Sequence, residues 1–120
     1  MEIVSFISTE TGKDLIVSFA IPASEMPGDV DSLTLLRTPM YEGILDDAER
    51  GVKLMPEDDD EEDMLTEVNF DKDAAVVTLT TDNGGRYELD VRKVDPVELE
   101  HMCSLLRKMN FDERIKLSGF

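Results

Sequence analysis

The chain has 120 residues, and its 28 acidic against 12 basic side chains give a formal net charge of −16. Nucleic acids and anionic membranes are bound through Lys and Arg, so this balance argues against both as partners. The longest uncharged stretch, residues 15–24, is about half of the ~20 residues that a membrane-spanning helix requires. With Glu2 at the start and no apolar leader, we expect a cytoplasmic protein.

A chain of this length can bury a core without disulfides or a structural metal. Its hydrophobic content is 41%, and the apolar residues fall in patterned blocks separated by turns. We therefore expect a single domain over residues 1–120. The single cysteine, Cys103, cannot form an intramolecular disulfide, which fits a reducing compartment.

The first third of the chain predicts three strands. Residues 2–8 and 14–21 are rich in Val, Ile and Phe and are joined by a glycine turn, which is typical of an antiparallel hairpin. A shorter strand is expected over residues 32–37. Along the second strand, four apolar residues recur at period two and should face the core: Leu15, Val17, Phe19 and Ile21.

A helix is expected next, from Pro39 to about Gly51. Thr38 is placed as its N-cap and Pro39 suits its first turn, whereas Gly51 stands where a left-handed C-terminal cap would lie. Apolar residues recur at the i, i+3, i+4 and i+7 spacing of one buried helical face: Tyr41, Ile44, Leu45 and Ala48.

An uninterrupted acidic run follows Pro56. Adjacent like charges repel one another, so we expect an acidic mobile loop over residues 56–63. An EF-hand loop beginning at Asp58 would have Asp63 where glycine is required and Asn69 where a bidentate glutamate is required. No metal site is therefore predicted. The run consists of Glu57, Asp58, Asp59, Asp60, Glu61, Glu62 and Asp63.

The second half predicts a three-stranded meander over residues 64–70, 75–81 and 86–92. In the last two strands the apolar residues that share a face have odd numbers, so odd must pair with odd across the hairpin. This parity requires a three-residue loop, Asp82 to Gly84, with Gly84 left-handed. If the preceding loop is residues 71–74, Val68 should lie opposite Val77, and Phe70 opposite Ala75.

The final helix has well-defined start signals. Asp95 is a suitable N-cap, Pro96 follows at the first helical position, and Glu98 would complete a capping box. Asn110 could take a left-handed cap at the other end, and residues 114–118 could add a short strand. The predicted buried stripe contains Leu99, Met102, Cys103, Leu106 and Met109.

These elements together predict an α+β fold. We expect a mainly antiparallel sheet of six to eight strands, ending in the C-terminal meander, with two helices packed on one face.

The residues that most often carry catalysis are sparse. The single histidine, His101, should lie on the solvated face of the last helix, whereas Cys103 should point into the core as a small buried hydrophobe. Residues two apart on a helix cannot share a proton or a metal. We therefore expect neither an enzyme nor a cofactor, although carboxylate pairs leave a small hydrolytic enzyme as an alternative.

The charge favours a non-catalytic interaction protein of the immunity, inhibitor or regulatory type that binds a basic protein partner. Two alternatives remain: the acidity serves only solubility, or the chain binds divalent cations weakly. The predicted partner-binding residues are Asp46, Asp47 and Glu49 on the first helix, together with the run from Glu57 to Asp63.

Overall fold

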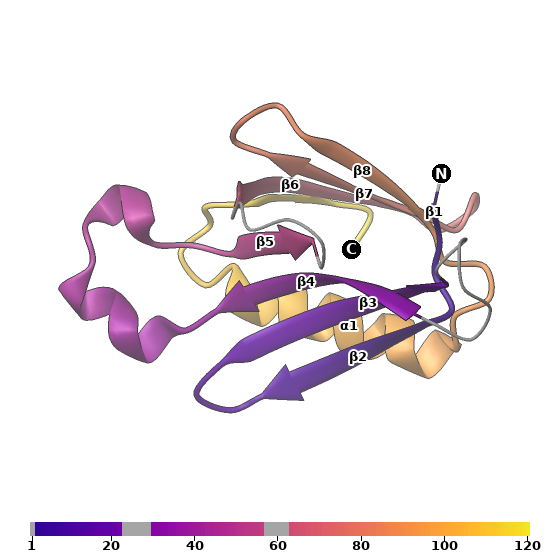
Figure 1. Ribbon diagram of the computed structural model, residues 1–120, viewed down its shortest axis with the longest axis horizontal. Coiled ribbons are helices and arrows are strands. Elements are labelled where there is room, and N and C mark those ends of the chain that lie inside the picture. The colour runs from indigo at the N-terminus through magenta and orange to yellow at the C-terminus, as the bar shows by residue number, and fades with distance from the viewer. Residues whose placement is uncertain (1, 23–29, 57–62) are drawn as a thin grey trace.

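The computed structural model describes residues 2–22, 30–56 and 63–120. These residues form a mixed sheet of nine strands, one α-helix and two short 3₁₀ helices (Figure 1). The elements are β1 (Glu2–Ile3), β2 (Phe6–Thr11), β3 (Leu15–Pro22), β4 (Val30–Arg37), η1 (Pro39–Ile44), η2 (Asp47–Glu49), β5 (Lys53–Pro56), β6 (Asp63–Asp71), β7 (Val76–Thr81), β8 (Arg86–Asp90), α1 (Pro96–Met109) and β9 (Lys116–Ser118).

The sheet curls until its two ends meet. Its strand order is β1-β8-β7-β6-β5-β4-β3-β2, with β9 also paired to β6, so the first two strands of the chain lie at opposite ends of this order. Only Val4 and Ser5 separate them. The Val4 N–H donates to the carbonyl of Asp90 (2.9 Å), and the Ser5 N–H donates to the carbonyl of Ala20 (2.8 Å). Residues 4 and 5 therefore join the two ends, and Val4 is completely buried at the junction.

Most neighbouring strands are antiparallel, but β1–β8 and β6–β9 are parallel. The predicted α+β class is confirmed in its coarse form, as a largely β structure with one main helix. That helix packs against β2 and β3 (Figure 1). Within the described ranges, no helix is both long enough and apolar enough to cross a membrane.

The N-terminal hairpin forms, but only β2 and β3 belong to it: residues 2–3 of the predicted first strand pair with β8 instead, and the turn is residues 12–14. Phe19 lies opposite Ile7 in β2 and opposite Leu33 in β4. Leu15, Val17 and Phe19 are buried, so the period-two pattern correctly identified the inner face of β3.

The second hairpin of the meander also has the predicted register. Val77 lies opposite Leu89, and Leu79 lies opposite Tyr87. The Thr81 N–H donates to the carbonyl of Gly85 (2.9 Å), which leaves residues 82–84 as a three-residue loop. Gly84 has the left-handed φ of 85° that this loop requires.

The first hairpin of the meander is displaced from the prediction. Phe70 pairs with Val77 rather than with Ala75, so the loop is residues 72–75. The Asp71 carboxylate causes this shift, because its Oδ1 accepts from the backbone N–H groups of Asp73 and Ala74 (both 3.1 Å) and starts the turn one residue later. Ala75 then takes a left-handed φ of 55°.

Helix α1 begins as predicted, with Asp95 Oδ1 accepting from the Val97 N–H (2.9 Å). The predicted capping box is wrong: Glu98 Oε1 instead accepts from the backbone N–H of Ile7 in β2 (2.8 Å). Leaving a strand N–H without a hydrogen-bond acceptor costs more free energy than omitting a second cap bond, since a buried, unsatisfied donor is costly.

The end of α1 also differs from the prediction. Asn110 has a φ of −95° rather than a left-handed cap geometry. Its side-chain amide instead donates to the carbonyl of Ile115 and accepts from the N–H of the same residue, both at 2.9 Å. These two bonds turn the chain from α1 into β9. The helical residues with buried side chains are Met102, Cys103, Leu105, Leu106 and Met109.

The first predicted helix, from Pro39 to about Gly51, does not form as an α-helix. Residues 39–49 form the two 3₁₀ turns η1 and η2, separated by extended backbone at Leu45 and Asp46. Thr38 makes no cap bond and donates its hydroxyl to Asp14 Oδ1 (2.6 Å). The physical reason is that Glu42 is the buried residue of η1, whereas the predicted helical face would have buried Tyr41 and Ile44.

Candidate functional site

Residues 38–51, which contain η1 and η2, join β4 to β5 and project beyond the end of the sheet (Figure 1). We call this segment the arm. It contains three of the acidic residues that the sequence singled out: Asp46, Asp47 and Glu49.

Arg37 holds the base of the arm and is only 1% exposed. Its guanidinium forms a bidentate pair with Glu42 (2.7 and 2.8 Å) and another with Asp112 (both 2.8 Å). A fifth bond runs from Nη1 to the carbonyl of Met109 (2.7 Å), and the Phe111 ring lies 4.1 Å from the guanidinium carbon. Every donor of this buried cation is therefore satisfied.

The charges in this cluster stabilise one another. Burial by itself lowers the pKa of Arg37, but its hydrogen bonds to Asp112 and Glu42 raise that pKa above its ordinary value. The same Arg37 hydrogen bond is the largest influence on Asp112, whose pKa is held well below its usual range. Arg37 and Asp112 are therefore both ionised at neutral pH.

A second cation, Arg114, fastens the middle of the arm. It forms ion pairs with Asp112 and with Asp47 in η2. Its Nη1 also donates to the backbone carbonyl of Asp47 (2.9 Å). The segment after α1 thus holds the arm at two points, one under η1 through Asp112 and one at η2 through Arg114.

The outer part of the arm combines apolar and acidic side chains. Met40 is 58% exposed, Tyr41 is 56% exposed and Ile44 is 87% exposed. Asp46 and Glu49 are exposed as well, and neither carboxylate has a side-chain partner among the residues that the structure describes. We call these five residues the tip.

The acidic residues predicted from the sequence fall into three groups. Asp46 and Glu49 lie at the tip, and Asp47 lies beside them but is paired with Arg114. Asp63 begins β6, and its Oδ1 accepts from the side-chain amide of Asn83 (2.7 Å), so it supports the hairpin loop. The rest of the run, Glu57 to Glu62, lies outside the described residues.

Sequence reasoning missed both the base of the arm and its apolar tip. One signal was available: Leu33, Leu35 and Arg37 have the same parity in β4, and the first two face the core. A basic residue on the inner face of a strand must find buried acidic partners. No comparable local signal indicated Asp112, which lies 75 residues further along the chain.

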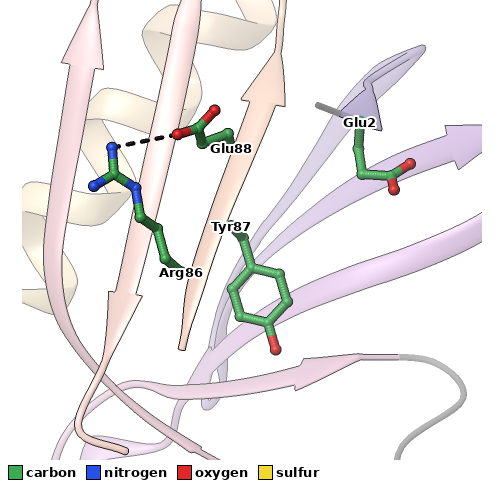
Figure 2. Close-up of a pocket in the computed structure, with 4 residues that line it drawn as sticks. All are labelled: Glu2, Arg86, Tyr87 and Glu88. Atoms are coloured by element: carbon green, nitrogen blue, oxygen red, sulfur yellow. Dashed lines mark ion pairs between the residues drawn. The ribbon is translucent and has the colours of Figure 1, made fainter. Parts of the chain in front are cut away.

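The hollow beside the arm is small, and another hollow lies away from the arm. The cleft at the base of the arm has a volume of about 170 Å³, below the roughly 300 Å³ of a typical small-molecule site. A second hollow, of about 320 Å³, lies beside β8 and is lined by Glu2, Arg86, Tyr87 and Glu88 (Figure 2). Arg86 and Glu88 form an exposed ion pair there (3.3 Å). The arm is thus an outward-facing surface rather than a pocket.

The residues considered for chemistry do not form a site together. His101 is exposed, Cys103 is buried, and burial raises the pKa of the Cys103 thiol. The described ranges contain no group of three or more His, Cys, Asp or Glu side chains placed to hold a metal ion.

Comparisons with protein-family models, with curated protein sequences and with solved structures found no significant match to this chain.

Proposed function

We propose that this chain is a non-catalytic interaction protein, of the immunity, inhibitor or regulatory kind, that binds a basic protein partner through the tip of the arm. The observation that carries the proposal is that three exposed apolar side chains, Met40, Tyr41 and Ile44, share a segment fastened at its base with two carboxylates that have no side-chain partner within the described residues.

Apolar and aromatic side chains supply most of the energy of a protein interface, whereas a charged rim sets its specificity and its association rate. The tip provides both in one segment. Ile44, at 87% exposed, gains most from being covered by a partner, because burying an isoleucine side chain is worth about 1.5–3 kcal/mol.

The buried base supports the proposal in a second way. Ordering a flexible loop at an interface costs free energy that is subtracted from the affinity. Arg37 and Arg114 already hold the arm before any partner arrives, so little ordering remains. The net charge of −16 would further accelerate encounter with a basic surface and slow encounter with an acidic one.

The experiment is a capture from a lysate of the source cells with three baits, followed by identification of the retained proteins. The baits are the wild type, a tip variant (Met40→Ser/Ile44→Ser) and a control variant (Ile3→Ser/Phe6→Ser). The control removes two apolar side chains that are 46% and 48% exposed and lie outside the arm.

The expected result is a basic protein that the wild type and the control retain, that the tip variant loses, and that high salt releases. Equal retention by the tip variant would refute the role of the tip. Retention of no basic protein by any bait would favour the alternative in which the acidity serves only solubility.

Association kinetics with the captured partner then test the charges. Asp46→Asn/Glu49→Gln should lower the on-rate by about threefold or more at low ionic strength and flatten its dependence on salt. The control Glu10→Gln/Asp73→Asn changes the net charge equally at exposed sites outside the arm. Equal effects from both variants would mean that only the net charge matters.

A further inference from the structure

A groove on α1 is unrelated to the arm. It lies between the helix and the turn that follows β6, and its volume is about 520 Å³, within the roughly 300–1,000 Å³ of small-molecule sites. Its apolar lining comes from Phe70, Pro96, Leu99 and Cys103. We call it the α1 groove.

Two cations stand in the lining of this groove, Lys72 from the turn after β6 and Arg107 from α1. Both line the same groove as Cys103, so the positive charge of each opposes the rise in the thiol pKa that burial causes. Within the described part of the chain, neither Lys72 nor Arg107 forms an ion pair. The one acidic lining residue, Glu100, is likewise not ion-paired there.

We propose that the α1 groove binds a small amphipathic anion, with its apolar part against Phe70 and Leu99 and its anionic head between Lys72 and Arg107. This inference does not depend on the proposed role of the arm.

The chemistry of the lining selects this class of ligand. A neutral apolar molecule would gain nothing from the two cations, and a cationic one would be repelled by them. A polyanion such as a nucleic acid would meet the net charge of −16 over the rest of the surface. A single anionic group on an apolar body avoids this repulsion and fits the two kinds of lining.

The probe is 8-anilinonaphthalene-1-sulfonate, an apolar ring system that carries one sulfonate, titrated into the full chain and followed by its fluorescence. For a ligand of this size in an open groove, we expect a dissociation constant on the order of 10–100 µM. Octanoate should displace the probe at lower concentrations than 1-octanol does.

Removing the two cations of the groove and removing its one acidic residue should change the affinity for the probe in opposite directions. Lys72→Gln/Arg107→Gln should weaken probe binding by about tenfold, whereas Glu100→Gln should strengthen it by about two- to threefold. The control Lys13→Gln/Lys116→Gln removes the same total charge at exposed positions that do not line the groove. It should change the affinity less than twofold.

Amide chemical shifts of the ¹⁵N-labelled wild type locate the bound probe without any substitution. Shifts concentrated at residues 70–72 and 96–107 would support the proposal. Shifts concentrated on the arm, or equal weakening by the groove variant and its charge-matched control, would overturn it, as would the absence of saturable binding.

Discussion

At the base of the arm, Arg37 and Glu42 are buried and paired, whereas at its tip Asp46 and Glu49 are exposed and have no side-chain partner within the described residues. These four charged residues lie within a stretch of thirteen positions. Their different environments follow from the topology: the segment after α1 supplies Asp112 to Arg37 and Arg114 to Asp47, whereas no bond from it to the side chains of Asp46 and Glu49 is found within the described residues.

The buried charges at the base and the exposed charges at the tip have different roles. A buried charge that loses its partner is strongly destabilising, so the base constrains the geometry of the arm. Exposed charges contribute little to folding and remain available to another molecule. Substitutions at the base should therefore lower the stability of the fold, whereas substitutions at the tip should leave it unchanged.

The largest effect is expected from Arg37→Met. This change leaves the Glu42 carboxylate, 8% exposed, without its bidentate partner. We expect the free energy of unfolding to fall by about 3–5 kcal/mol, the usual cost of leaving one half of a buried pair. Urea unfolding at neutral pH, followed by circular dichroism, measures the change.

A double variant tests the stated cause. Arg37→Met/Glu42→Met removes both charges of the pair and should recover part of the stability that the single substitution loses, because no carboxylate is then buried alone. If the double variant is less stable than Arg37→Met, the loss does not arise from an unpaired Glu42.

The second effect is a pH-dependent one at Asp112. Its pKa is held well below the usual range by Arg37, so its contribution to stability is fully present above the unfolded-state pKa of about 3.9 and is lost as the pH falls further. Asp112→Asn should cost about 1–3 kcal/mol at pH 7. The stability difference from the wild type should be constant above about pH 5 and narrow below pH 4.

Urea unfolding of the wild type and Asp112→Asn at a series of pH values gives this difference directly. A difference that persists undiminished at pH 3 would show that Asp112 stabilises the fold through its shape or packing and not through its charge.

The same contrast explains which elements the sequence could predict. The register of the β7–β8 hairpin depends on the parity of neighbouring residues and on the turn at Gly84, and the start of α1 depends on Asp95 and Pro96. All of these signals lie within a few residues of the structure that they specify, so they can be read without knowing the fold.

Two of the wrong predictions, the capping box of α1 and the helix over residues 39–51, depend on distant partners. Glu98 binds the backbone N–H of Ile7, which is 91 residues away. Glu42 faces inward because Arg37 lies beneath it, and Arg37 is held in turn by Asp112. The apolar spacing of residues 41–48 matched a helix, but these long-range bonds outweighed it. Thus the acidic part of the candidate site was predictable, whereas its apolar part was placed in the core.

The third effect, at Glu98, tests whether a loss of stability away from the arm weakens partner binding. Glu98→Ala leaves the Ile7 N–H without its carboxylate acceptor, and we expect a loss of about 1–2 kcal/mol. Because α1 begins far from the arm in the fold (Figure 1), binding of the captured partner should be unchanged at a temperature where the variant is folded. Weaker binding by Glu98→Ala would mean that partner affinity follows general stability.

The smallest effect on folding is expected at the tip. Asp46→Asn/Glu49→Gln removes two exposed carboxylates that have no side-chain partner in the described part of the chain, so the melting temperature should move by less than about 3 °C. The same variant should slow association with a basic partner. A large fall in melting temperature would mean that these carboxylates, like Arg37 and Asp112, stabilise the fold. An unchanged melting temperature with a slower on-rate would establish that the arm divides its charges between folding at the base and recognition at the tip.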